Sequence, residues 1–97
     1  MDRHAILDRL RAEAPALREK YRLESLAVFG SMARGDDHEE SDVDVLVRFQ
    51  GQADFDRFMG LKLDLEDMFQ RRVDLGTPDT LRPEMRANVE RDIIHVP

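Results

Sequence analysis

Apolar residues in the first 21 positions recur every three or four residues, with charged residues between them. This spacing is typical of an amphipathic helix that buries one face. Pro15 interrupts the run, and a proline inside a helix removes a backbone donor. The pattern therefore predicts two short helices, 2–13 with Asp2 as its N-cap and 15–21 with Pro15 in its first turn.

Four other segments have the pattern of strands. Residues 25–29 form an apolar run that is too short for a helix and ends at Gly30, which predicts a buried strand followed by a tight turn. Apolar and polar residues alternate over 43–49, as on a half-buried strand. Residues 72–75 predict a third short strand, and 92–96 a closing apolar one.

The remaining segments predict helices and a loop. They are a short helix over 31–35, a polar loop over 36–41, a helix over 54–70 with Asp54 as its cap, and a final helix over 83–91. Helices therefore alternate with strands along the chain. This order predicts an α/β fold with a small mixed β-sheet of about four strands, flanked by helices, in a single domain over 1–97.

Composition narrows the class of protein. No apolar run approaches the roughly 18 residues of a membrane helix, and the N-terminus does not have the pattern of a signal peptide. The chain has no cysteine, which favours a cytoplasmic protein and excludes disulfides. Its net charge is −6, whereas proteins that bind nucleic acid usually present a basic surface. We therefore expect neither a membrane nor a nucleic acid as its direct partner, but rather metal cations, the nucleotides that bind with them, or a basic protein.

Asp42 and Asp44 are the first candidates for chemistry. Residues i and i+2 of a strand point to the same face, about 6.6–6.8 Å apart along the chain. Two carboxylates so placed can share the pair of ions of a two-metal phosphoryl-transfer site, and magnesium accepts such ligands. The alternative is that Asp42 belongs to a turn and Asp44 only faces solvent, as charged residues on antiparallel sheets often do.

Gly30-Ser31 and Asp74 complete a set of signals. A glycine turn after a buried strand lets a ligand approach the backbone, and amides entering a helix can hold phosphate oxygens. Val73 and Leu75 would face the core, which places Asp74 on the opposite face. If its strand pairs beside 43–49, Asp74 becomes a third carboxylate. Each feature alone is compatible with an ordinary turn or a charge at a strand end.

The combined motif resembles a known family. Its residues are Gly30-Ser31-x-Ala33-Arg34-Gly35, followed by Ser41-Asp42-x-Asp44-x-Leu46-Val47. They resemble the signature of the polymerase-beta-type nucleotidyltransferases and, more closely, the minimal nucleotidyltransferases of prokaryotes. The resemblance spans nearly the whole chain and implies the polymerase-beta-type nucleotidyltransferase fold.

The resemblance also implies roles for individual residues. The motif residues Gly30, Ser31, Arg34 and Ser41 would contact the nucleotide, and Gly30 and Ser31 would hold its triphosphate. Asp42 and Asp44 would bridge two Mg²⁺ ions, and Asp74 would complete the site and serve as, or orient, the base. For Arg34 a phosphate contact and a structural ion pair both stay open. In relatives the position of Arg48 is often acidic, so a solvated or ion-paired arginine is expected there.

Many small members of this family are antitoxins encoded beside a HEPN-type ribonuclease toxin, and they transfer AMP from ATP to a toxin tyrosine. The resemblance therefore implies a magnesium-dependent protein adenylyltransferase whose partner is such a toxin, with which it could form an oligomer. The catalytic core takes up the whole sequence, so we expect the acceptor to come from a partner's surface. Two alternatives are transfer to a small-molecule hydroxyl and a toxin-binding module without catalysis.

Overall fold

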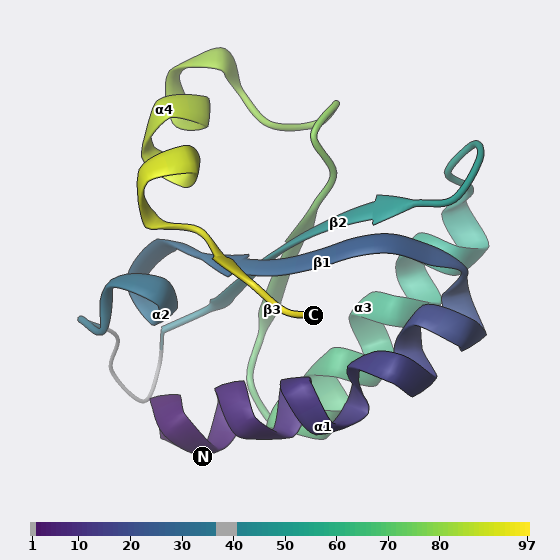
Figure 1. Ribbon diagram of the computed structural model, residues 1–97, viewed down its shortest axis with the longest axis horizontal. Helices are drawn as coiled ribbons and strands as arrows, with labels where there is room; N and C mark the ends of the chain where they lie inside the picture. Colours follow the sequence, from purple (N-terminus) through teal and green to yellow (C-terminus); the bar gives the residue numbers. More distant parts are fainter. Residues whose placement is uncertain (1, 37–40) are drawn as a thin grey trace.

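The computed structural model describes residues 2–36 and 41–97, without the side chains of 85 and 88, and folds them around one four-stranded sheet (Figure 1). Most of the loop predicted over 36–41 lies outside the described residues. No helix in the described ranges is long and apolar enough to cross a membrane.

The sheet is mixed, as the sequence predicts. Its strands lie in the order β3-β2-β1-β4. Strand β1 pairs antiparallel with both β2 and β4, whereas β2 and β3 run parallel. The bounds are Leu23–Phe29 for β1, Val43–Phe49 for β2, Val73–Gly76 for β3 and Ile94–His95 for β4. The last strand is shorter than predicted because residue 92 still belongs to the preceding helix.

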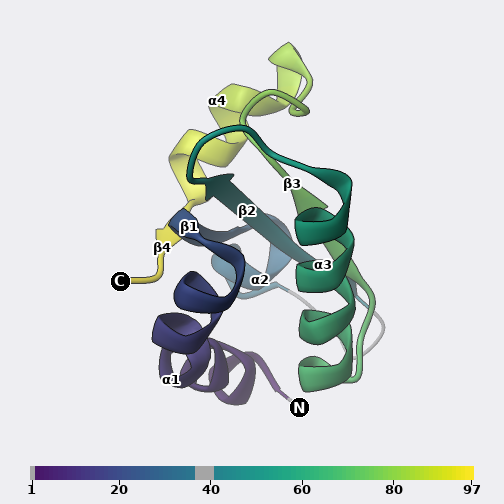
Figure 2. The ribbon, with the colours of Figure 1, turned by 90° about the vertical axis from the view of Figure 1, so that its right-hand side faces the viewer.

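Helices lie on both sides of this sheet. Helices α1 (Arg3–Tyr21) and α3 (Phe55–Phe69) lie together along one face, and α4 (Pro83–Asp92) lies on the other side (Figures 1 and 2). Helix α2 (Gly30–Arg34) is a short helix that directly follows β1. The face of the sheet that α4 covers only in part carries the polar side chains of β2.

The core lies between the sheet and the α1/α3 layer. Alternate residues of β2 enter it fully, since Val43, Val45 and Val47 are each 0% exposed. Leu10 of α1 and Leu65 of α3 are buried in the same cluster. Because strand side chains alternate between the two faces, the burial of these valines turns the intervening residues of β2 toward the opposite side.

Helix α1 is continuous, so the prediction of two helices is wrong. Pro15 lies inside it, in an exposed position. The proline cannot donate a hydrogen bond to the preceding turn. Buried residues on both sides of it, Leu10 and Ala14 before and Leu17 after, anchor the helix to the core. This burial offsets the missing hydrogen bond, as tertiary packing often does.

The predicted N-caps are confirmed. Asp2 Oδ1 accepts a hydrogen bond from the backbone N–H of Ala5 at 2.8 Å, and Asp54 Oδ1 accepts one from Arg57 at 2.7 Å. Each cap satisfies an N–H that the first turn of a helix leaves without a partner. Strand β1 begins two residues before the predicted range, at Leu23.

Two leucines on α3 test this packing. Leu61 is 0% exposed and Leu63 is 57% exposed, although they are two residues apart on one helix. We expect Leu61→Ala to lower the free energy of unfolding by about 2–5 kcal/mol, because it leaves a cavity in the core. Leu63→Ala should change it by less than about 0.5 kcal/mol, as surface substitutions usually do. Urea unfolding of both variants measures the difference, and equal losses would contradict the described orientation of α3.

Candidate functional site

Parallel pairing brings two of the predicted carboxylates side by side. Asp44 on β2 and Asp74 on β3 are direct partners in the register of these strands. Adjacent strands lie about 4.8 Å apart, so the two side chains project next to each other. Asp42 precedes Asp44 by two residues. The structure therefore gathers all three candidates at one end of the β2/β3 pair.

The three carboxylates are accessible to solvent to different degrees. Asp42 and Asp74 are exposed, whereas Asp44 is half-buried. Asp74 lies between the buried residues Val73 and Leu75, and Asp44 between Val43 and Val45. Both therefore point away from the α1/α3 layer, toward the open face of the sheet. This is the orientation that a reaction with a bound molecule requires.

Gly30 makes room for Asp44. Phe29, the last residue of β1, is the register partner of Asp44, and Gly30 follows it with a φ of +70°. A Cβ atom added at Gly30 would lie 2.1 Å from Asp44 Oδ2. Any other residue would strain this backbone conformation and would displace the Asp44 carboxylate from its position. The glycine of the motif is thus required by a carboxylate fourteen residues later in the chain.

Crowding of negative charge changes the acidity of Asp44. Burial and the neighbouring Asp74 and Asp42 raise the pKa of the Asp44 carboxyl from its ordinary value of 3.8 to about 6, while Arg34 acts in the opposite direction. Burial disfavours the ionised form, and so do like charges nearby. A cation bound among the three carboxylates would remove both penalties.

Helix α2 is fixed at its C-terminal end by a residue from α1. Arg3 Nε donates a hydrogen bond to the backbone oxygen of Met32 at 2.7 Å, and Arg3 Nη2 donates one to Ala33 O at 3.3 Å. The helix ends at Gly35, which has a φ of +82° and whose N–H donates to Ser31 O at 2.9 Å. These bonds satisfy carbonyl groups at the end of α2 and fix the position of this short helix, which includes Gly30 and Ser31.

Arg34 forms ion pairs on the surface of the site. Its Nε lies 3.1 Å from Asp36 Oδ2, and its Nη1 lies 3.3 Å from Asp92 Oδ2. Of the two roles left open for Arg34, the structure shows the ion pair. Asp92, at the end of α4, was not among the predicted site residues. No motif in the sequence marks it, because only the fold brings α4 next to α2.

Two cavities meet at the carboxylates. One has a volume of about 290 Å³ and contains Gly30, Ser31, Arg34 and Asp44 in its wall, closed on the far side by Val89 and Asp92. The other has a volume of about 450 Å³. Its lining residues come from α3 and the starts of β2 and β3, and include Asp42, Asp74, Lys62, Glu66 and Arg72. The acidic cluster therefore faces one cavity beside β1 and another beside β3.

Ser41 and Arg48 lie at the margins of the site. Ser41 is partly buried and directly precedes Asp42, next to the undescribed 37–40. Arg48 is exposed on the same face of β2 as Asp44. Four residues along a strand correspond to about 13 Å, so Arg48 lies well away from the carboxylates.

Hard oxygen donors are the ligands that magnesium prefers, and three carboxylates supply them here. In the described part of the chain no group of three or more Asp, Glu, His or Cys side chains is arranged so that it could hold a metal ion by itself. Magnesium does not need such a cage, because it retains waters and uses substrate phosphates as further ligands. The chemistry of the three donors therefore fits this cation, and the side chains of Asp42, Asp44 and Asp74 would hold it after turning toward one another.

Comparison with known families decides the class of protein. Residues 10–96 match the family described as "Nucleotidyltransferase domain". The chain belongs to the nucleotidyltransferase family. "Protein adenylyltransferase MntA" of Thermococcus cleftensis is 36% identical over 87 residues, which are 90% of this chain and 88% of that protein. "Putative protein adenylyltransferase MJ0128" of Methanocaldococcus jannaschii is 38% identical and is covered over 94% of both chains.

Solved structures share the same fold. The structure described as "putative minimal nucleotidyltransferase" is 35% identical, with a TM-score of 0.82 over 97% of this chain and 95% of that one. The same fold occurs in the structure described as "toxin-antitoxin with AMP-PNP", at 20% identity, a TM-score of 0.73 and coverage of 89% of this chain and 71% of that one. The predicted polymerase-beta-type nucleotidyltransferase fold is thereby confirmed.

Gly30 and Gly51 both have a positive φ, so substituting each by alanine separates the cost of backbone strain from the cost of a collision with Asp44. Gly51 has a φ of +66° with no atom near an added Cβ, whereas Gly30 has the same strain and the Asp44 contact. We expect Gly51→Ala to cost about 1–2 kcal/mol from backbone strain alone. Gly30→Ala should cost clearly more and displace the Asp44 side chain. Urea unfolding measures both losses, and equal values would contradict the packing of Asp44 against Gly30.

Stability should depend on pH through Asp44. Between its ordinary pKa of 3.8 and about 6, the folded protein retains a proton that the unfolded chain releases. The stability present below pH 3.8 is therefore lost as the pH rises through about 6. Asp44→Asn has no such proton, so it should become more stable than the wild type near neutral pH and approach it in acid. Unfolding in urea from about pH 4 to about pH 8, with a chelator present, measures this. If the free energies of unfolding of the wild type and of Asp44→Asn change with pH in parallel, the pKa of Asp44 is not raised.

Proposed function

We propose that this nucleotidyltransferase is a magnesium-dependent protein adenylyltransferase that transfers AMP from ATP to a hydroxyl of a partner protein. One observation carries the proposal: Asp44 and Asp74 are register partners beside Asp42, and the Asp44 carboxylate packs against the Gly30 turn. An acidic cluster thus adjoins a cavity lined by the glycine–serine turn. The relatives named as protein adenylyltransferases are 36–38% identical over most of their length.

Asp42, Asp44 and Asp74 would hold two magnesium ions. Such ions neutralise the charge that develops on the attacking and departing oxygens of an in-line phosphoryl transfer. Asp44 is the central ligand of this set because it neighbours both other carboxylates and is the least exposed of the three. The exposed Asp42 and Asp74 can adjust their side chains toward a common centre at little cost, since neither is packed in the core.

The cavity beside β1 would hold the β- and γ-phosphates of ATP. The backbone amides at the start of α2 and the Ser31 hydroxyl can donate hydrogen bonds to phosphate oxygens in this cavity. Arg34 borders the cavity and its ion pair with Asp36 is exposed, so a phosphate can compete for its guanidinium. Ser41 is placed next to Asp42 by the motif and would contribute a further hydroxyl from the other side.

Asp74 would act on the acceptor. It lies on the far side of Asp44 from Gly30, in the wall of the cavity beside β3. There it can accept the proton of an incoming hydroxyl. A bond forms between the acceptor oxygen and the α-phosphorus of ATP, and the bond from that phosphorus to the bridging oxygen breaks. The products are AMP-protein and pyrophosphate, and the proton leaves through Asp74.

A HEPN-type toxin is the proposed acceptor. The relative MntA is a protein adenylyltransferase by name, and the same fold occurs in an MNT antitoxin bound to a tri-AMPylated HEPN toxin of Shewanella oneidensis. That structure shares the fold at 16% identity and a TM-score of 0.67, with coverage of 93% and 71%. The exposed cavity beside β3 leaves the carboxylates accessible to a protruding side chain of such a partner.

Transfer of label tests the proposal. The protein is incubated with Mg²⁺, ATP labelled at the α-phosphate and the protein encoded beside it in its genome. We expect label on that partner, and loss of the rate by about 100-fold or more in Asp42→Asn, Asp44→Asn or Asp74→Asn, as when a transition state loses a main electrostatic stabiliser. Asp67→Asn, an exposed carboxylate on α3, is the matched control and should retain the rate.

The other outcomes identify the alternatives. Neutralisation of the partner without label, unchanged in the three variants, would establish a binding module without catalysis. Turnover of a small hydroxylated compound instead of the partner would establish transfer to a small molecule. Label that persists in Asp74→Asn would contradict its assignment as the acceptor-side carboxylate.

A further inference from the structure

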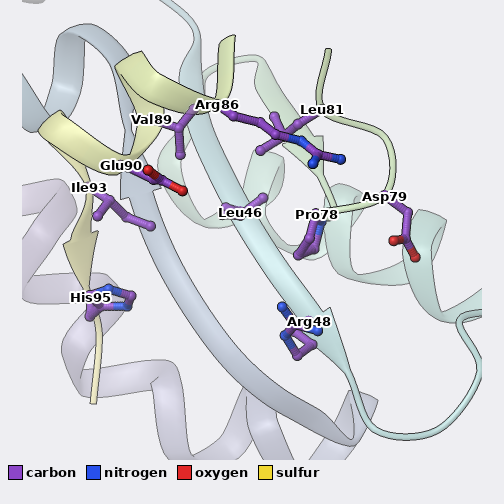
Figure 3. Close-up of a pocket in the computed structure, with 10 residues that line it drawn as sticks. All are labelled: Leu46, Arg48, Pro78, Asp79, Leu81, Arg86, Val89, Glu90, Ile93 and His95. Atoms are coloured by element: carbon purple, nitrogen blue, oxygen red, sulfur yellow. The ribbon is translucent and has the colours of Figure 1, made fainter. Parts of the chain in front are cut away.

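A groove of about 570 Å³ lies on the open face of the sheet, between α4 and the segment 77–82 (Figure 3). Leu46 of β2 forms its floor, and Val89 of α4 and Ile93, which directly follows α4, lie on one side. Pro78 and Leu81 lie on the opposite side. Its volume is in the range of small-molecule sites, about 300–1,000 Å³. The acidic cluster and the two cavities described above do not account for it.

Polar groups surround this apolar floor. Figure 3 shows them around Leu46: Arg48, Asp79, Arg86, Glu90 and His95. They are exposed at the rim, where they can form hydrogen bonds with a bound molecule. A flat ring with polar edges fits such a groove, because apolar side chains cover its faces and the rim satisfies its donors and acceptors.

The groove continues into the site of the carboxylates. Val89 lines both the groove and the cavity that contains Gly30, Ser31 and Asp44. Leu46 follows Asp44 by two residues on the same face of β2, about 6.7 Å along the strand. The groove and the cavity at Asp44 therefore adjoin each other on the same face of β2, with Val89 in the wall of both.

The geometry of the reaction distinguishes the groove from the two cavities beside the carboxylates. In an in-line displacement the incoming and departing oxygens lie on opposite sides of the phosphorus. Departing pyrophosphate occupies the cavity of Gly30, beside β1, and the acceptor approaches from Asp74, beside β3. The 5′-oxygen of the nucleoside is bonded to the same phosphorus and must leave between these two directions. Along β2, the direction that remains leads over Leu46.

We propose that this groove binds the nucleoside of the donor nucleotide, with the base on Leu46 between the α4 side and the 77–82 side. This assignment rests on the proposed function, because it takes the phosphate at Asp44 as its starting point. An acceptor side chain does not compete for the groove, since its hydroxyl must reach the phosphorus from the side opposite to pyrophosphate.

Two probes and one substitution test the groove. The chain has no tryptophan, so Leu46→Trp fills the groove and also introduces a single fluorescent reporter. Binding of ATP and of inorganic triphosphate, which lacks a nucleoside, is measured by calorimetry in Mg²⁺. We expect Leu46→Trp to weaken ATP binding by about tenfold or more and to leave triphosphate binding unchanged. The control Leu63→Trp, on the exposed side of α3, should affect neither probe.

Each result decides between the two proposals. Failure of the wild type to bind triphosphate, or binding that survives Asp44→Asn in full, overturns the phosphate site and hence the proposed function. If Leu46→Trp changes neither ATP nor triphosphate binding, the groove assignment is overturned. An equal loss of both affinities overturns it too. In either case the proposed function still stands. Should Leu46→Trp fail to fold, Ile93→Ala removes apolar surface from the groove instead. It should weaken ATP alone, and no change in ATP binding would overturn the assignment.

Discussion

The contact between the Asp44 carboxylate and the Gly30 turn is the constraint on which the rest of the site depends. Asp44 can face the open side of the sheet only because its neighbours on β2 enter the core and because residue 30 has no Cβ. The same strand pairing that places Phe29 beside Asp44 places Asp74 on its other side. A glycine turn, a central carboxylate and a second carboxylate thus follow one another across three adjacent strands, and negative charge accumulates at one end of β2 and β3.

The remaining elements hold this arrangement in place. Helices α1 and α3 bury the opposite face of the sheet, and Arg3 of α1 ties down the end of α2. Helix α4 closes the site from above through the ion pair of Asp92 with Arg34. The open face of β2 therefore separates into an acidic end and an apolar groove, both bordered by α4. In the proposed function this division serves one ligand, with its phosphates at the acidic end and its ring in the apolar groove.

Local patterns were sufficient for much of this fold. The alternation over 43–49 gave the range of β2 and the face of Asp44, and both aspartate caps follow from their positions before helical runs. The two-helix prediction over the first 21 residues was wrong because buried side chains on both sides of Pro15 outweigh one lost hydrogen bond. Asp92 and the groove over Leu46 could not be predicted, since they depend on where α4 packs. The catalytic and nucleotide-binding roles of the motif residues remain predictions that the geometry supports.

Paramagnetic line broadening by Mn²⁺, in the presence of a non-hydrolysable ATP analogue, tests the central claim most directly. Mn²⁺ accepts the same oxygen ligands as magnesium and broadens the NMR signals of nearby nuclei. Substoichiometric Mn²⁺ should first broaden the signals of Asp42, Asp44, Asp74 and Gly30, while those of Asp64 and Asp67 on α3 stay sharp. Broadening centred on other carboxylates, or signals of Asp74 that stay sharp while those of Asp44 disappear, would contradict a single site shared by the three strands.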